Sequence, residues 1–187
     1  MDIYLIRHTQ TAAEKGLCYG RSDIALADSF AQEAEALRQK LPELSEDCRF
    51  YSSALSRCKR LADSLSDEVV TDERLLELDF GDWEGVFFND IDAKALNHWT
   101  QNFVDVPPPN GENFTDLCRR AGSFWQELIE TELSQAVVVT HAGVIRALLT
   151  HILKLSPAAA FQFRVDHGSL HKFQYSHQYT YIHYLNL

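Results

Sequence analysis

The sequence predicts an α/β fold: a three-layer sandwich with a mostly parallel central sheet, helices on both faces, and a small cap of helices and loops. Short apolar runs of strand-forming residues alternate along the chain with stretches whose apolar residues recur at helical spacing. The strongest apolar run, Ala136–Val139, passes directly into a helical pattern, as a parallel strand and its crossover helix do. No repeat or linker interrupts the 187 residues, so we expect a single domain over 1–187.

The first half of the chain predicts three strands and two helices. Ile3–Ile6 suits a buried strand, and the polar residues 9–27 suit a loop. Asp28 is the expected cap of a helix whose apolar residues end at Leu41, before Pro42. The other elements expected here are a strand at Arg49–Tyr51, a helix over 55–65 and a brief strand at Val69-Val70.

The middle of the chain predicts the cap. Residues 75–112 are irregular and contain a Pro107-Pro108-Pro109 run, so we expect loops with short helices there, with the cap at about 78–112. A longer helix is expected from near Asn113, with Leu117 among its inward residues.

The last quarter of the chain predicts one more helix and a hairpin. The pattern after the strongest strand favours a helix over Val144–Leu155 that Pro157 ends. Aromatic and polar residues alternate from Leu170 to Leu187, which favours two late strands joined through His177-Gln178.

Composition and charge narrow the class of partner. The chain is acidic, with a formal net charge of −10, and has no run of Lys and Arg, so it should repel nucleic acids. The expected partner is a small phosphorylated metabolite, since a pocket can be locally positive within an acidic surface. No apolar run reaches the length of a membrane span and no signal peptide is evident, so we expect a cytoplasmic monomer or homodimer. Its four scattered cysteines are typical of reduced thiols rather than disulfides or a zinc site.

Basic side chains follow the ends of several predicted strands. Arg7-His8 follows the first strand, His141-Ala142-Gly143 follows the strongest, and Arg57 comes soon after Ser52-Ser53. If these strands are neighbours, two imidazoles and two guanidiniums converge where ligands bind in such sheets. Arginine forks fit phosphate oxygens, and a neutral imidazole can attack phosphorus. A lone histidine after a strand is more often structural, but two such strand ends together indicate a phosphate site.

The chain resembles the histidine phosphatase, or phosphoglycerate mutase-like, superfamily along almost its whole length. Four motifs occur in order, and a short Gly-Glu motif follows the third. They are Leu5-Ile6-Arg7-His8, residues 51–57, residues 74–85 with the later Gly111-Glu112, and Val139-Thr140-His141-Ala142-Gly143. The resemblance implies a phosphomonoester hydrolase that works through a phosphohistidine and uses no metal or other cofactor. A metal-dependent phosphatase is also disfavoured because the sequence has no clustered Asp/His ligand set.

The resemblance also implies roles for the matching residues. His8 would be the nucleophile that accepts the phosphoryl group. Arg7, Arg57 and His141 would hold its oxygens and stabilise the charge in transit. Ala142 and Gly143, at a helix N-terminus, would add backbone amides to the phosphate site.

The acid of the reaction is assigned to Glu77 by the same resemblance. It would protonate the leaving oxygen and then act as the base that activates water. Glu84 is the neighbouring alternative for this role. The structural alternative for Glu77 is a surface carboxylate paired with Arg74.

Thr9 is a departure from the family pattern, which usually has Gly after the nucleophile. A side chain there would either crowd the phosphate or donate its hydroxyl to it. The Asn that relatives often carry a few positions later is missing from residues 11–14. Arg21 is a further candidate for binding phosphate or a substrate hydroxyl, and a surface ion pair with Asp23 fits it equally well.

The substrate is indicated by residues 18–26, which resemble a subgroup of α-ribazole-5′-phosphate phosphatases. The implied reaction removes phosphate from α-ribazole 5′-phosphate during assembly of the cobalamin nucleotide loop. A flat benzimidazole could stack on one of the cap aromatics, although most of these are expected to form the core of the cap. They are Trp83, Phe87, Phe88, Trp99 and Phe103.

Several alternatives stay open on the sequence alone. They are a broad-specificity phosphatase, a phosphoglycerate mutase-like phosphotransferase, a phosphoprotein phosphatase acting on phosphohistidine, and a non-catalytic phosphate-binding module. A mutase would depend on a bisphosphorylated primer, and a binding module would show binding without turnover.

His167 precedes a late strand and can lie near the pocket rim, although a structural role is the simpler interpretation.

Overall fold

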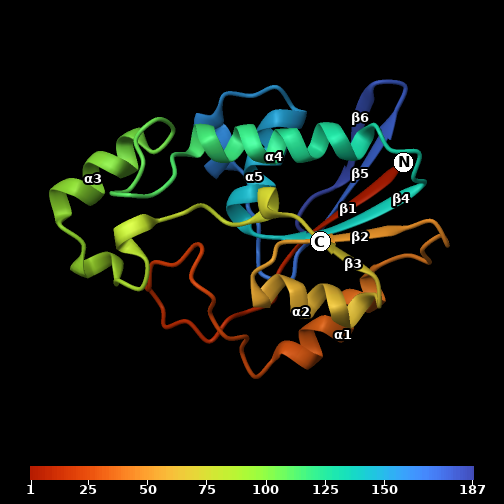
Figure 1. Cartoon of the computed structure of the whole chain (residues 1–187), viewed down its shortest axis with the longest axis horizontal. Helices are drawn as coiled ribbons and strands as arrows, with labels where there is room; N and C mark the ends of the chain where they lie inside the picture. Colours follow the sequence, from red (N-terminus) through yellow and green to blue (C-terminus); the bar gives the residue numbers. More distant parts are fainter.

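A six-stranded mixed sheet forms the centre of the computed structural model, which describes residues 1–187 (Figure 1). The strand order is β3-β2-β4-β1-β5-β6. Strands β3, β2, β4 and β1 run parallel, and β5 is antiparallel to both of its neighbours, β1 and β6. The strands are β1 (Asp2–Arg7), β2 (Arg49–Ser52), β3 (Val69–Thr71), β4 (Gln135–Thr140), β5 (Leu170–Ser176) and β6 (Tyr179–Tyr184). The predicted α/β class with a mostly parallel sheet is confirmed.

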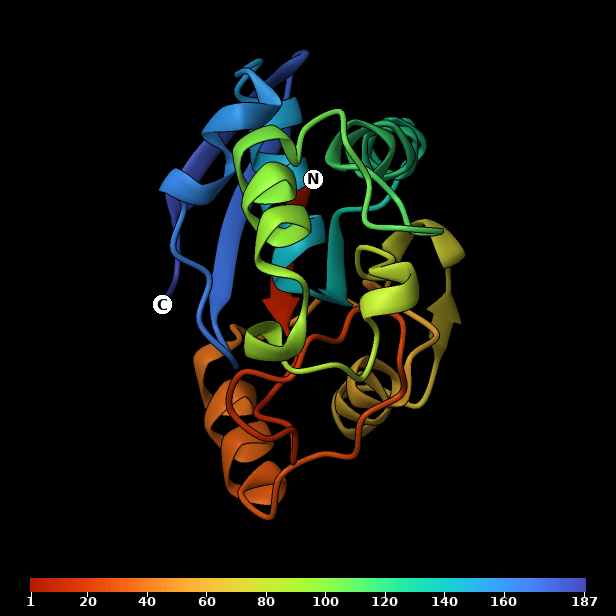
Figure 2. The same ribbon diagram turned by 90° about the vertical axis from the view of Figure 1, so that its left-hand side faces the viewer.

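Helices cover both faces of the sheet. They are α1 (Phe30–Lys40) and α2 (Ser56–Leu65) on one face, and α4 (Phe114–Ile129) and α5 (Ala142–Ile152) on the other (Figures 1 and 2). Alternate residues of the central strand β1 pack into these two layers, because successive side chains of a strand point to opposite faces. Ile3 and Leu5 belong to the core with α4 and α5, whereas Tyr4 and Ile6 belong to the core with α1 and α2.

The segment predicted as the cap holds α3 (Ala93–Asn102) and short 3-10 turns, and it projects beyond the carboxyl ends of the central strands (Figure 1). A small separate core of Cys18, Trp83 and Ile91 holds it together. Backbone hydrogen bonds of Cys18 with Val86 and Gly85 join the loop after β1 to this segment. The loop that carries residues 18–26 is therefore joined to the segment predicted as the cap.

Two predicted helix ends are wrong by a few residues. The first helix begins at Phe30 with Ser29 rather than Asp28 at the N-cap, and the Ser29 hydroxyl donates to the Glu33 carboxylate. The helix after β4 covers Ala142–Ile152 and stops before Pro157, because Lys154 takes a left-handed backbone conformation (φ 53°).

The terminal hairpin is confirmed, including its turn. His177 and Gln178 both have positive φ values, as a two-residue hairpin turn requires. No helix in the structure combines the length and the apolar character that crossing a membrane demands.

Candidate active site

The three strand ends that carry the predicted site residues are neighbours in the sheet, in the order β2-β4-β1. Arg7 pairs with Thr140 and Ser52 with Val139, so His8, Ser53 and His141 leave the sheet at the same edge. The rings of His8 and His141 lie with their centroids 5.2 Å apart. The convergence predicted from the sequence is confirmed.

The His8 imidazole is buried and held in one tautomer. Its Nδ1 lies 2.7 Å from the carbonyl oxygen of Thr9, which can only accept, so Nδ1 carries the proton and Nε2 keeps its lone pair. Burial, together with the nearby Arg57 and Arg7 cations, holds the pKa of His8 well below its usual value. The ring is therefore neutral at neutral pH, which is the state a histidine nucleophile needs.

Two guanidiniums near this ring are held by backbone carbonyl oxygens and, for Arg7, also by the His167 side chain. Arg57, fully buried near the start of α2, donates to the oxygens of Gly20 (2.5 Å) and Ser22 (2.8 Å). Arg7 donates to the oxygen of Val165 (2.8 Å) and to Nε2 of His167 (2.8 Å). Neither guanidinium pairs with a carboxylate, so both positive charges remain available to an anion.

Three buried polar atoms of the chain have no hydrogen-bond partner, and all three belong to this cluster. They are Nε of Arg7, Nε of Arg57 and Oγ1 of Thr9. Leaving buried donors unpaired costs free energy, so such a group of donors is suited to a tetrahedral oxyanion. The Thr9 hydroxyl is thus a buried donor without a partner, and whether it donates to phosphate or crowds it stays open.

His141 sits at the N-cap of α5 and is completely buried. Its Nε2 lies 2.8 Å from the Ser53 hydroxyl, and the Cys58 thiol packs against the same ring. Burial, helped by the other charged groups of the site, lowers the pKa of His141 well below its usual value.

The Glu77 carboxylate is tied to the start of α5. Its Oε2 accepts from the amide of Gly143 (3.0 Å), and its Oε1 accepts from the amide of Leu78 (2.9 Å). A methyl group on Gly143 would lie 2.2 Å from Oε1, so only glycine allows this approach. In this structure, therefore, the Gly143 amide, which the sequence analysis assigned to phosphate, donates to Glu77 instead. Contact of phosphate with Ala142 and Gly143 stays a prediction.

Two alternatives to Glu77 as the acid were an ion pair between Glu77 and Arg74, and Glu84 in the acid role. The pairing of Glu77 with Arg74 is wrong, because Arg74 binds Asp72 (2.6 Å) and Glu127 (2.7 Å) instead. Glu84 accepts hydrogen bonds from the backbone of Gly20, Arg21, Ser22 and Phe80 and from the Ser22 hydroxyl. Burial raises the pKa of Glu84, but these hydrogen bonds outweigh it and leave the pKa below its usual value. Such a carboxylate organises a loop and is a poor proton donor.

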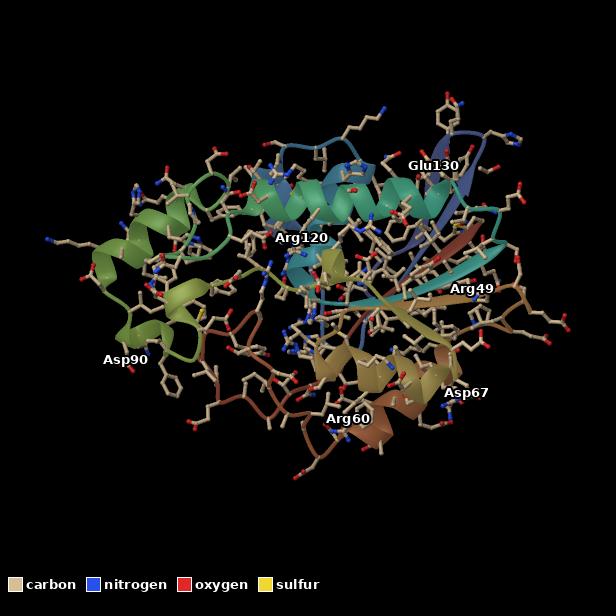
Figure 3. All side chains as sticks on the ribbon, in the orientation of Figure 1. Arg49, Arg60, Asp67, Asp90, Arg120 and Glu130 are labelled. Atoms are coloured by element: carbon tan, nitrogen blue, oxygen red, sulfur yellow. The ribbon has the colours of Figure 1, made fainter.

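Arg120 is a residue of the site that sequence reasoning missed. It extends from α4 toward the middle of the molecule, whereas the labelled Arg49 and Glu130 lie at the periphery (Figure 3). Its guanidinium forms a double hydrogen bond with Glu112 (2.7 Å each) and donates to the carbonyl oxygens of Arg74, Leu76 and Glu77. Arg120 therefore fixes the backbone that carries Glu77. The signal in the sequence is a charged residue on an inward helix face, between Leu117 and Phe124.

Arg21 does not form the ion pair considered for it. Asp23 instead accepts from the amide and hydroxyl of Ser56. The Arg21 guanidinium lies 3.5 Å from Asp79 and 3.6 Å from Glu112, at the base of the cap. Its contact with substrate stays a prediction.

Most of the cap aromatics line an apolar cleft of about 490 Å³. The lining residues are Phe80, Phe88, Trp99, Thr100, Phe103 and Phe161. Of the five aromatics named from the sequence, only Trp83 is a buried member of the small core of the cap. The prediction that most of them form this core is therefore wrong, because Phe88, Trp99 and Phe103 line the cleft. Arg146 of α5 lies over the ring of Phe161, which lines the cleft, at 5.2 Å. The same helix holds the Glu77 carboxylate through the amide of Gly143, so the cleft borders the helix that binds Glu77.

Four neutral histidines around the site make the fold sensitive to acid. Burial lowers the pKa of His171 to about 4, and burial together with the Arg7 cation lowers the pKa of His167 to about 4. The pKa values of His8 and His141 lie well below the ordinary value of 6.5, mainly because both rings are buried. Between these values and about 6.5 the unfolded chain binds more protons than the folded chain, so the free energy of unfolding falls as pH falls. Each of the three buried histidines contributes up to about 1.4 kcal/mol per pH unit, and the exposed His167 contributes less because solvent screens its charge.

We therefore expect the urea midpoint to drop steadily between pH 7 and pH 5. His171→Gln should flatten this dependence, because the glutamine has no proton to take up. A midpoint that is constant, or that rises on acidification, would contradict the assigned neutral state of these rings.

The chain is similar in sequence and in fold to known proteins. The chain is 32% identical over 177 residues to the adenosylcobalamin/α-ribazole phosphatase of Escherichia coli, which covers 90% of this chain and 87% of that protein. The structure of the α-ribazole phosphatase from Shigella flexneri superposes with a TM-score of 0.92 at 28% identity, over 100% of this chain and 96% of that one. A 2,3-bisphosphoglycerate-dependent phosphoglycerate mutase from Cytophaga hutchinsonii is 29% identical over 83% of this chain and 78% of its own length.

The family assignment rests on more than these individual relatives. The histidine phosphatase superfamily (branch 1) matches residues 3–187, which include every residue placed in the site above. The chain therefore belongs to branch 1 of the histidine phosphatase superfamily and is a phosphomonoester hydrolase.

Proposed function

We propose that this protein hydrolyses α-ribazole 5′-phosphate through a phosphohistidine formed on His8. The observation that supports the phosphohistidine is the fixed tautomer of His8, a buried ring that keeps the lone pair on Nε2 and feels the Arg7 and Arg57 cations. The Arg7 and Arg57 cations attract the phosphate dianion and offset the charge that builds up during transfer.

The first step transfers the phosphoryl group to the enzyme. Nε2 of His8 donates its lone pair to phosphorus as the bond between phosphorus and the ester oxygen breaks. Glu77, in its protonated form, gives its proton to the departing oxygen, so the alcohol leaves neutral. Arg7, Arg57 and the Thr9 hydroxyl hold the phosphoryl oxygens during this transfer.

The second step releases phosphate. Glu77, now a carboxylate, takes a proton from water while the water oxygen attacks phosphorus and the phosphorus–nitrogen bond breaks. His8 recovers its lone pair and Glu77 its proton, so the site returns to its starting state. The hydrogen bonds from Gly143 and Leu78 keep the carboxylate in place through both steps.

The aromatic cleft supports α-ribazole 5′-phosphate as the substrate. Its lining is almost entirely apolar, and it borders α5, the helix whose Gly143 amide holds Glu77. A benzimidazole one ribose away from the phosphate has a flat apolar ring to place there, whereas small acids such as 3-phosphoglycerate have none. Two relatives at about 30% identity are named α-ribazole phosphatases, which agrees with this choice.

The test compares turnover of α-ribazole 5′-phosphate, 3-phosphoglycerate, phosphoserine and phenyl phosphate by the purified protein in the presence of EDTA. We expect kcat/KM for the ribazole ester to exceed that for the two small acids by at least about a hundredfold. Trp99→Leu should raise KM for the ribazole ester by about tenfold and leave the small acids unchanged. The control is Tyr179→Leu, which removes an exposed aromatic residue outside the cleft.

Two outcomes would count against parts of this proposal. Comparable turnover of all four esters would overturn the ribazole assignment and leave a broad-specificity phosphatase. Phosphate transfer between phosphoglycerates, dependent on a bisphosphorylated primer, would favour a mutase instead.

A further inference from the structure

The turn formed by residues 166–169 is fastened to the backbone of the nucleophile. The amide of Gly168 donates to the carbonyl oxygen of His8, and the amide of Arg7 donates to the carbonyl oxygen of Ser169, both at 3.1 Å. Gly168 has a φ of +64°, a conformation that glycine adopts without strain. Any side chain carried by this turn is therefore placed in fixed register with Arg7 and His8.

His167 is the side chain that this turn presents to the site. Its ring centroid lies 5.4 Å from that of His8, at the exposed rim of the pocket. Nη2 of Arg7 lies 2.8 Å from Nε2 of His167, and because a guanidinium can only donate, this nitrogen must hold a lone pair. The neighbouring carbonyl oxygen of Val165 takes the other terminal nitrogen of Arg7.

Residues 165–167 thus hold both terminal nitrogens of Arg7 and leave its buried Nε without a partner. Neither of the two acceptors carries a charge. A carboxylate in the place of His167 would orient Arg7 equally well but would neutralise the charge that attracts the phosphate. A neutral imidazole orients the guanidinium and preserves its full charge.

We propose that His167 is a positioning residue that orients the Arg7 guanidinium for phosphate binding. This inference rests on the proposed phosphate site, in which Arg7 holds phosphoryl oxygens. Partial burial and the Arg7 cation lower the pKa of His167 to about 4, so its acceptor lone pair persists through the neutral range. The sequence favoured a structural role for this residue, and the hydrogen bond to Arg7 is what changes that interpretation.

The test uses three variants that separate the acceptor atom from the bulk of the ring. His167→Ala removes both, His167→Leu keeps bulk alone, and His167→Gln keeps an acceptor near the position of Nε2. Affinity for inorganic phosphate is measured by calorimetry, beside kcat and KM for phenyl phosphate and the midpoint of thermal unfolding.

We expect the Ala and Leu variants to weaken phosphate binding and raise KM by about tenfold, with kcat changed much less and the thermal midpoint unchanged. The Gln variant should return both constants to within about threefold of the parent. Equal behaviour of Gln and Leu, or parental phosphate affinity in the Ala variant, would overturn the proposal. Phosphate affinity does not depend on turnover, so this result stands apart from the identity of the substrate and from a failure of the hydrolysis mechanism.

Discussion

His8→Ala is expected to lower kcat by at least about 10⁴-fold for every phosphomonoester tested, because it removes the atom that forms the covalent intermediate. The loss should be uniform across substrates, since the first step of every hydrolysis uses the same lone pair. The substitution leaves a cavity next to His141 but removes no charge, because the ring is neutral in the folded protein. Phosphate binding through Arg7 and Arg57 should therefore survive in the variant.

The measurement combines steady-state rates with direct detection of the intermediate. The parent protein, mixed with a labelled phosphomonoester and quenched, should carry label that is stable in alkali and released by acid, as a phosphohistidine is. His8→Ala should carry none. His98→Ala, on the exposed face of α3, is the matched control and should behave as the parent does. Residual activity of His8→Ala above about 1% would mean that another group performs the attack.

The sequence predicted the parts of this molecule that depend on local patterns. Ala136–Val139 and Ile3–Ile6 are buried strands because their residues are apolar and strand-forming, and the structure places them side by side. His8 and His141 follow these strands directly, so the parallel pairing alone brings their rings together. The site residues within two positions of a strand end were therefore predictable from the fold class.

The residues that sequence reasoning missed or left open are those whose role comes from distant contacts. Arg120 reaches the carbonyl oxygens of Arg74, Leu76 and Glu77 from a helix more than 40 positions away. His167 meets Arg7 across 160 positions. No spacing pattern connects such residues, because their separation is set by how the layers pack. The same holds for Glu84, whose structural role is visible only in the folded protein, where the backbone amides of residues 20–22 donate to its carboxylate.

Glu77→Gln should reduce turnover most strongly when the leaving group is a poor one. An alcohol such as a sugar hydroxyl cannot depart readily as an alkoxide, so loss of the proton donor should lower kcat by about 10²- to 10⁴-fold. A nitrophenolate leaves without a proton, and for nitrophenyl phosphate the first step should therefore stay fast. The ratio between the two losses measures how much of the role of Glu77 is that of an acid.

The same variant should reveal the second role of Glu77 in its transient kinetics. If water is activated by this carboxylate, Glu77→Gln forms the phosphohistidine with nitrophenyl phosphate but breaks it down slowly. The first turnover then appears as a burst of nitrophenol equal to the enzyme concentration, followed by a slow steady state. Label on His8 should accumulate in parallel. Without a burst, Glu77 would be limited to the first step or to substrate binding.

Gly143→Ala tests the same carboxylate by changing the residue whose amide binds it. The added methyl group would lie 2.2 Å from Oε1 of Glu77, so the carboxylate must move away from the position that both proton transfers require. We expect this variant to reproduce the leaving-group dependence of Glu77→Gln with only a modest change in the thermal midpoint. Glu84→Gln is the contrasting control: it should destabilise the loop of residues 20–22 and lower activity equally for good and poor leaving groups. If the Glu84 variant instead showed the stronger leaving-group dependence, the acid would be Glu84. The pKa of Glu84, which its hydrogen bonds lower in this structure, would then have to rise when substrate binds.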